Sequence, residues 1–113
     1  MLARVNRLVR GTDYRNVVRH GRKVGSRLTV MYVVKRDDEV PARFGFIVAK
    51  TVGNAVVRNR VRRRLKAASF ELLASGWGGS DVVIRALPSS AAASWTNLRS
   101  EVFNAAERIE ARQ

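Results

Sequence analysis

The chain has 113 residues, enough for a single domain over residues 1–113 with its own hydrophobic core. It carries 22 Lys and Arg against 9 Asp and Glu, a formal net charge of +13, and this excess indicates a polyanionic partner. The lack of cysteine and the single histidine exclude disulfides, thiolate chemistry and metal sites built on those residues. Without a membrane-length apolar run or a secretory signal, the chain is expected in the cytoplasm.

The first half of the chain has the pattern of one short helix followed by strands. The helix is predicted from a cap at Thr12 to a stop at Gly21, and residues 22–26 could add a short strand. Residues 28–35 and 43–50 are rich in β-branched and aromatic residues, and a polar turn separates them, which predicts neighbouring antiparallel strands. The strand 43–50 has one bulky face and one face of mostly small side chains.

The second half begins with a long helix from about Asn54. Its apolar residues form one stripe that should face the sheet: Val57, Val61, Leu65, Ala68 and Leu72. A glycine-rich loop over 75–80 precedes a buried strand over 81–87, and Ser94 or Thr96 caps a last helix. This order of elements predicts a two-layer α+β sandwich.

The long helix carries an unusual concentration of positive charge. Residues 50–66 contain seven cations and no carboxylate: Lys50, Arg58, Arg60, Arg62, Arg63, Arg64 and Lys66. A helix selected for stability alone would interleave Glu with Arg to form pairs four residues apart. Arginine also favours bidentate recognition of phosphate, so we interpret this helix as a nucleic-acid-binding surface. The alternative is a solvated face in an Arg-rich protein.

Catalytic groups are scarce by comparison. The nearest candidate for a metal site is the run Asp37, Asp38 and Glu39, which we interpret as a charged turn. We therefore predict no catalytic residue and no metal ligand in the protein itself.

Two segments at fixed spacing resemble the signature of the bacterial ribonuclease P protein subunit. They are Gly-Phe-Ile-Val-Ala-Lys at 45–50 and Gly-Asn-Ala-Val-Val-Arg-Asn-Arg-Val-Arg-Arg at 53–63, with Arg58-Asn59-Arg60 as the core. Asn6-Arg7-Leu8, the short aromatic helix, Tyr32 and the chain length also match, so the resemblance spans nearly the whole chain.

The resemblance implies a ribosomal-protein-like sandwich with a four-stranded mixed sheet and about three helices. It also implies a left-handed βαβ crossover through the basic helix, against the usual right-handed rule. The implied function is to assist a catalytic RNA in the Mg²⁺-dependent removal of 5′ leaders from precursor tRNA. Mg²⁺ would be held mainly by the RNA and the substrate, with none bound tightly by the protein, and the isolated protein would be a monomer.

The resemblance also implies two binding surfaces. The catalytic RNA would contact Lys50, Gly53, Asn54, Arg58, Asn59, Arg60, Arg62, Arg63 and Lys66. The single-stranded leader would contact Tyr14, Val18, Arg27, Tyr32 and Lys50. Val18 departs from the family pattern, which has a second aromatic residue there, and the other interpretation of Tyr14, Val18 and Tyr32 is a core face.

Two other classes of function compete with this interpretation. One is a stand-alone RNA-binding or ribosome-associated protein that uses the same helix without a catalytic partner. The other is a protein nuclease acting alone, which the lack of an acid cluster disfavours.

Overall fold

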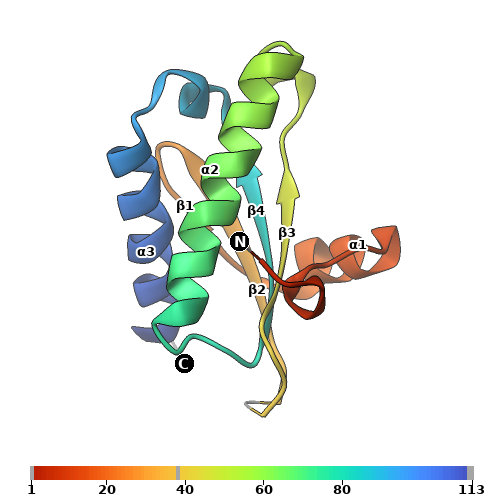
Figure 1. The fold of residues 1–113 in the computed structure, drawn as a ribbon. Helices are drawn as coiled ribbons and strands as arrows, with labels where there is room; N and C mark the ends of the chain where they lie inside the picture. The colour runs from red at the N-terminus through yellow and green to blue at the C-terminus, as the bar shows by residue number, and fades with distance from the viewer. Residues whose placement is uncertain (1, 38, 112–113) are drawn as a thin grey trace.

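A computed structural model describes residues 2–37 and 39–111 as a four-stranded sheet with helices on both faces (Figure 1). The elements in chain order are α1 (Gly11–His20), β1 (Arg22–Gly25), β2 (Thr29–Lys35), β3 (Arg43–Ile47), α2 (Ala55–Ala74), β4 (Ser80–Ala86) and α3 (Trp95–Ala111). Short 3₁₀ turns are η1 (Arg4–Asn6), η2 (Lys50–Val52) and η3 (Pro88–Ala92). The predicted α+β class is confirmed, including the strand expected at 22–26.

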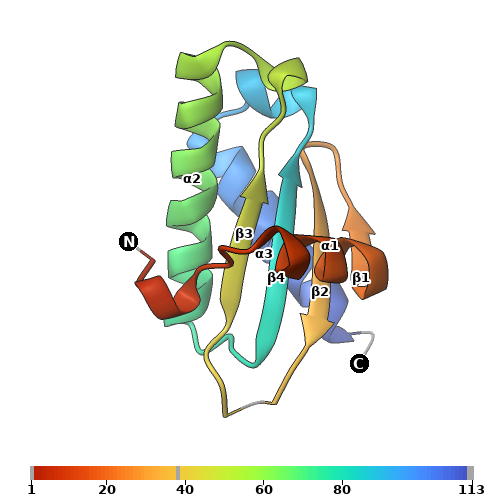
Figure 2. The ribbon, with the colours of Figure 1, turned by 90° about the vertical axis from the view of Figure 1, so that its right-hand side faces the viewer.

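The strand order in the sheet is β1-β2-β4-β3 (Figure 2). β2 pairs with β1 and β4 antiparallel, whereas β3 pairs with β4 parallel. The prediction that β2 and β3 are neighbours is therefore wrong, because β4 lies between them. The polar turn between them suggested a local hairpin, but β4 is buried along most of its length and takes the central position, where both faces of the sheet are covered. The handedness of the β3-α2-β4 crossover stays a prediction.

The main core lies between the sheet and the pair α2 and α3. The predicted stripe of α2 is buried at Val61, Leu65, Ala68 and Leu72 and belongs to one cluster with Phe44. Leu98, Val102 and Ile109 of α3 belong to the same cluster. This half of the molecule is the predicted two-layer sandwich.

A smaller core lies on the opposite face of the sheet, under α1. Leu8, Val17, Tyr32 and Val83 are buried together there. In Figure 2, α1 crosses in front of the sheet, α3 lies behind it and α2 stands at the left beside β3, and the ends of β3 and β4 extend above α1. Part of this sheet face is therefore not covered by a helix.

The helix ends were partly predictable. Asn54 caps α2 by accepting a hydrogen bond from the Val57 N–H at 3.0 Å, and Ser94 rather than Thr96 caps α3. The predicted cap of α1 is wrong: that helix already begins at Gly11, after Arg10. In the described part of the chain, no helix is both long enough and apolar enough to cross a membrane.

Candidate nucleic-acid interface

The outward face of α2 is a strip of positive charge without counter-charges. Asn59, Arg63 and Lys66 are exposed, and Arg58 and Arg62 are half-buried. Within residues 2–37 and 39–111, no ion pair joins a carboxylate to a cation between positions 58 and 66. The helix therefore presents several guanidinium groups to a partner from outside the protein.

Two arginines of the same helix are instead engaged by the fold. Arg60 donates from Nη2 to the carbonyl of Ala91, and Arg64 donates from Nη1 to the carbonyl of Ala93, both at 2.9 Å. These bonds hold the segment around η3 against α2. Arg60, predicted to bind RNA, thus has a structural role that its place in the motif did not indicate.

Three further residues predicted to bind RNA lie just before α2, at its N-terminal end. Lys50 lies in η2 and is exposed, and Asn54 is exposed at the cap. Gly53 lies where the chain turns into the helix, with a φ of 158°. A Cβ at Gly53 would lie 2.9 Å from Cγ1 of Val57, so the glycine permits this close turn.

A groove of about 440 Å³ lies between α1 and the uncovered part of the sheet. Its lining residues come from α1, β3 and β4: Tyr14, Arg15, Val18, Arg19, Ile47 and Arg85. Three of these six side chains are cationic and none is acidic. The groove thus combines positive charge with apolar surface, as sites for single-stranded nucleic acid do.

Tyr14 is fixed in this groove by its contact with β3. Its hydroxyl accepts a hydrogen bond from the Phe46 N–H at 3.2 Å. The ring lies over Gly45, where an added Cβ would be 2.5 Å from Cζ of the tyrosine. The small face of the predicted strand therefore serves to seat Tyr14 against the backbone.

The other residues predicted to bind the leader do not all meet Tyr14. Val18 lines the groove, but Tyr32 is only 5% exposed and lies in the core beneath α1. Arg27 lies in the turn between β1 and β2, where its carbonyl accepts a hydrogen bond from Ser89 Oγ. Neither Arg27 nor Lys50 lines the groove.

Sequence reasoning missed Arg15, Arg19 and Arg85. Arg85 interrupts the run of apolar residues that follows Asp81 in a strand that was interpreted as buried. Its charge was the available signal, because a charged residue in such a strand indicates an uncovered patch of the sheet.

Tyr14 also borders a second hollow, of about 160 Å³, on the other side of β3. Arg62 and Lys66 of α2 line this hollow together with Phe46 and Arg7. The groove beside α1 and the charged strip of α2 are therefore adjacent, and Tyr14 lies between them.

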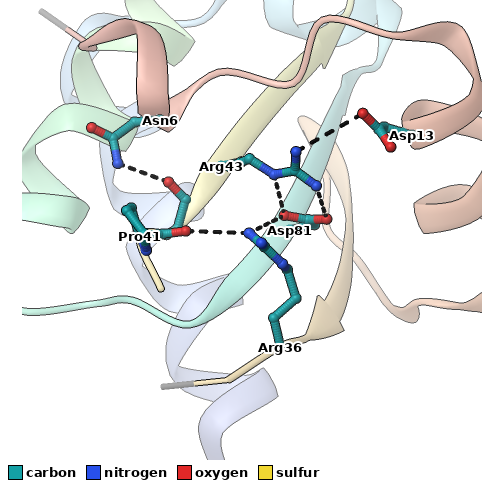
Figure 3. A network of polar contacts seen from close by, with 7 residues as sticks. Asn6, Asp13, Arg36, Pro41, Arg43 and Asp81 are labelled. Carbon is teal, nitrogen blue, oxygen red and sulfur yellow. Dashed lines mark hydrogen bonds and ion pairs between the residues drawn. The ribbon is translucent and has the colours of Figure 1, made fainter. Parts of the chain in front are cut away.

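A buried carboxylate ties α1 to the sheet below the groove (Figure 3). Asp81, whose side chain is 8% exposed, accepts hydrogen bonds from Arg43 at 2.7 and 2.9 Å and from Arg36 at 3.2 Å. Arg43 also lies 4.0 Å from Asp13 of α1. The hydrogen bond to Asp81 raises the pKa of the Arg43 guanidinium above its ordinary value, against the opposing effect of burial.

The described residues do not provide a metal site. They contain no group of three or more His, Asp or Glu side chains that could hold an ion. Of the acidic run in the β2–β3 turn, Asp38 lies outside the described residues, and Asp37 accepts a hydrogen bond from the Glu39 N–H at 3.0 Å.

Comparison with known proteins gives consistent matches over nearly the whole chain. The family model described as Ribonuclease P matches residues 2–110. The ribonuclease P protein component of Clavibacter michiganensis is 48% identical over 108 residues, covering 96% of each chain. That of an Arthrobacter strain is 49% identical over 106 residues, covering 94% of this chain and 77% of its own.

Solved structures share the fold at lower identity. The RNase P protein of Staphylococcus aureus aligns with a TM-score of 0.80 at 22% identity, covering 92% of this chain and 94% of its own. The RNase P protein of Thermotoga maritima aligns with a TM-score of 0.76 at 18% identity, covering 87% and 92%.

Proposed function

The chain belongs to the ribonuclease P protein family, and we propose that it binds the catalytic RNA through α2 and the precursor tRNA leader through the groove beside α1. The family supplies the protein component of an endoribonuclease that processes the 5′ leader of precursor tRNA, and its partner is the ribonuclease P RNA, which carries the catalysis. The observation that supports the proposal most is the unpaired positive strip of α2 next to a groove lined by Tyr14.

The surface proposed for the catalytic RNA is the outward face of α2 with its N-terminal approach. Its members are Lys50, Gly53, Asn54, Arg58, Asn59, Arg62, Arg63 and Lys66. RNA phosphates provide the counter-charge that the protein lacks here, and each neutralised phosphate steepens the salt dependence by about 0.7 to 0.9 log units. Arg60 contributes mainly by holding η3 in place, with its remaining donors available to RNA.

The surface proposed for the leader is the groove. Tyr14 offers a ring for stacking, Val18 offers apolar contact, and Arg15 and Arg19 line one side with positive charge. Tyr32 supports the floor rather than stacking on a base, because it is buried. Arg27 and Lys50 lie outside the groove and are proposed to contact the leader only beyond it.

The protein's contribution to the reaction is electrostatic and positional. Mg²⁺ ions, on which the family's hydrolysis generally depends, are held by RNA and substrate phosphates in this proposal, because the described residues do not fit a hard divalent cation. By neutralising phosphates near the cleavage site, the protein lowers the Mg²⁺ concentration that the RNA needs. We further propose that the chain is one domain, monomeric when isolated, and acts in the cytoplasm, where precursor tRNA is made.

The test is cleavage of a leader-bearing precursor tRNA by a bacterial ribonuclease P RNA at low Mg²⁺, with and without the protein. We expect stimulation that is lost when Arg58, Arg62 and Arg63 are all changed to Ala and kept when Arg108 of α3, which donates to the Gly25 carbonyl and lies outside both proposed surfaces, is changed to Ala. If the intact protein binds the RNA but does not favour the precursor over mature tRNA, a stand-alone RNA-binding role replaces this proposal.

A further inference from the structure

One cation in the groove comes from the sheet rather than from a helix. Arg85 is exposed on β4, opposite Val30 of β2 and Ile47 of β3. Side chains alternate along a strand, so Arg85 shares its face with Val83 and Asp81, the face that α1 covers only in part. Arg85 is the next-to-last residue of β4, and the C-terminal end of that strand extends beyond α1 (Figure 2).

The Arg85 guanidinium is held over an aromatic ring and carries no counter-charge. Its Cζ lies 5.6 Å from the ring centroid of Tyr32. Among residues 2–37 and 39–111, no hydrogen bond or ion pair engages the Arg85 side chain. The one acid on this face of β4, Asp81, is bound to Arg36 and Arg43 instead.

This arrangement determines which part of a nucleotide could bind here. Tyr32 is 5% exposed and Arg85 lies over its ring, so no base can stack on it. The ring contact occupies one face of the guanidinium and leaves the N–H groups at its edge without an acceptor. Edge N–H groups of arginine suit phosphate oxygens, which they bind in pairs.

Building on the groove proposed above for the leader, we propose that Arg85 binds a backbone phosphate of the single-stranded leader. Tyr32 orients the guanidinium from below, and Tyr14 and Val18 lie on the α1 side of the same groove. At this point the groove recognises the leader by charge rather than by base stacking. Recognition here is therefore independent of leader sequence and sensitive to salt.

The test compares holoenzymes reconstituted with a bacterial ribonuclease P RNA and with wild-type protein, Arg85→Ala, Arg85→Lys or Arg108→Ala. Arg108 lies on α3, behind the sheet, and its replacement removes the same charge away from the groove. For each, Kd is measured from the dependence of single-turnover cleavage on holoenzyme concentration, at fixed Mg²⁺ and several salt concentrations. The substrates are one precursor tRNA with a full leader and the same tRNA with its leader shortened to one nucleotide.

We expect Arg85→Ala to weaken binding of the full-leader substrate about 5- to 20-fold, from the upper end of the range for an exposed ion pair to the lower end of that for a hydrogen bond to a charged group. The slope of log Kd against log salt should become shallower by about 0.7, the value for one phosphate of a single strand. Arg85→Lys should keep the slope and most of the affinity. Arg108→Ala, and every variant with the one-nucleotide leader, should match wild type.

Three results would overturn the role of Arg85 while leaving the groove intact: full affinity of Arg85→Ala, an equal loss on both substrates, or a loss with an unchanged slope that Lys does not restore. If instead the wild-type holoenzyme does not distinguish the two substrates, the leader groove itself is refuted, and the role of Arg85 falls with it.

Discussion

Gly45→Ala is the sharpest test of how the groove is built. The added Cβ would lie 2.5 Å from Cζ, 2.6 Å from Cε2 and 2.7 Å from the hydroxyl oxygen of Tyr14. Carbon atoms in contact are ~3.5–4.0 Å apart, so the ring must retreat by roughly 1 Å or more. The tyrosine ring moves rather than β3, because β3 is paired along β4 and the ring is the end of a side chain.

Two losses follow from that movement. The hydrogen bond from the Phe46 N–H to Tyr14, now 3.2 Å, is broken or weakened, and the ring leaves the position where we propose that it stacks on a leader base. The hydrogen bond is worth ~0.5–1.5 kcal/mol of stability, and replacing glycine in a strand returns ~0.5–1 kcal/mol. Net stability should therefore change by no more than about 1 kcal/mol. Leader affinity should fall about 5- to 20-fold. This loss is smaller than the upper end of the ~1–3 kcal/mol that complete removal of base stacking costs.

The assay is a double-mutant cycle with Tyr14→Ala, using Kd for a full-leader precursor tRNA and urea denaturation for stability. In the Tyr14→Ala background, Gly45→Ala should leave Kd unchanged within about 0.5 kcal/mol and should slightly stabilise the fold. Gly25→Ala in β1 is the matched control, because no described atom outside its chain neighbours lies within 4 Å of the added Cβ. An equal loss of leader affinity with and without Tyr14 would refute the reasoning.

Three further predictions concern single residues. Asp81→Asn should destabilise the fold by about 2–4 kcal/mol in urea denaturation, because three hydrogen bonds from two arginines lose their anionic acceptor in a nearly buried site. A loss of stability below about 1 kcal/mol would contradict this prediction. Asn54→Ala should cost about 1 kcal/mol of unfolding free energy through the lost helix cap, while Asn59→Ala, within the same helix, should cost much less. Arg60→Ala should lower the free energy of unfolding by about 1 kcal/mol, because its hydrogen bond to the Ala91 carbonyl is lost. Arg63→Ala should leave stability unchanged and reduce the salt dependence of catalytic-RNA binding. The reverse pattern would show that Arg60 is the RNA contact and Arg63 the structural residue.

The sequence was most informative where structure depends on near neighbours. The buried stripe of α2 and the caps at Asn54 and Ser94 were predicted because helix periodicity and capping involve residues within four positions of one another. The motif around Arg58 was likewise contiguous, so its place on α2 followed from the same periodicity, although only Asn59 of the Arg58-Asn59-Arg60 core is fully exposed.

The features that were missed depend on contacts between distant segments. β4 lies between β2 and β3 although it follows both in the chain, and no local pattern indicates that insertion. Gly45 is small because of Tyr14, 31 positions earlier, and Arg60 and Ala91 meet across the same separation. Arg85 was missed because its neighbours in the sequence are apolar and indicate a buried strand. Its exposure depends on how far α1 covers the sheet, which the local sequence does not indicate.

The placement of acids explains how the protein tolerates a net charge of +13. Several described acids have partners within the protein. Asp81 binds Arg36 and Arg43, Glu71 binds Arg99 at 2.8 Å, and Glu101 accepts a hydrogen bond from the Leu28 N–H at 3.1 Å. The charged face of α2 and the groove beside α1 receive no such partner among the described residues. Repulsion between exposed cations more than about 8 Å apart is largely screened at physiological salt, so it acts mainly between near neighbours on the surface. In the proposed complex, the catalytic RNA neutralises the cations of α2 and the leader neutralises those of the groove, and the two surfaces adjoin at Tyr14. The same charges that would weaken an isolated fold therefore become the source of affinity when the polyanion is present.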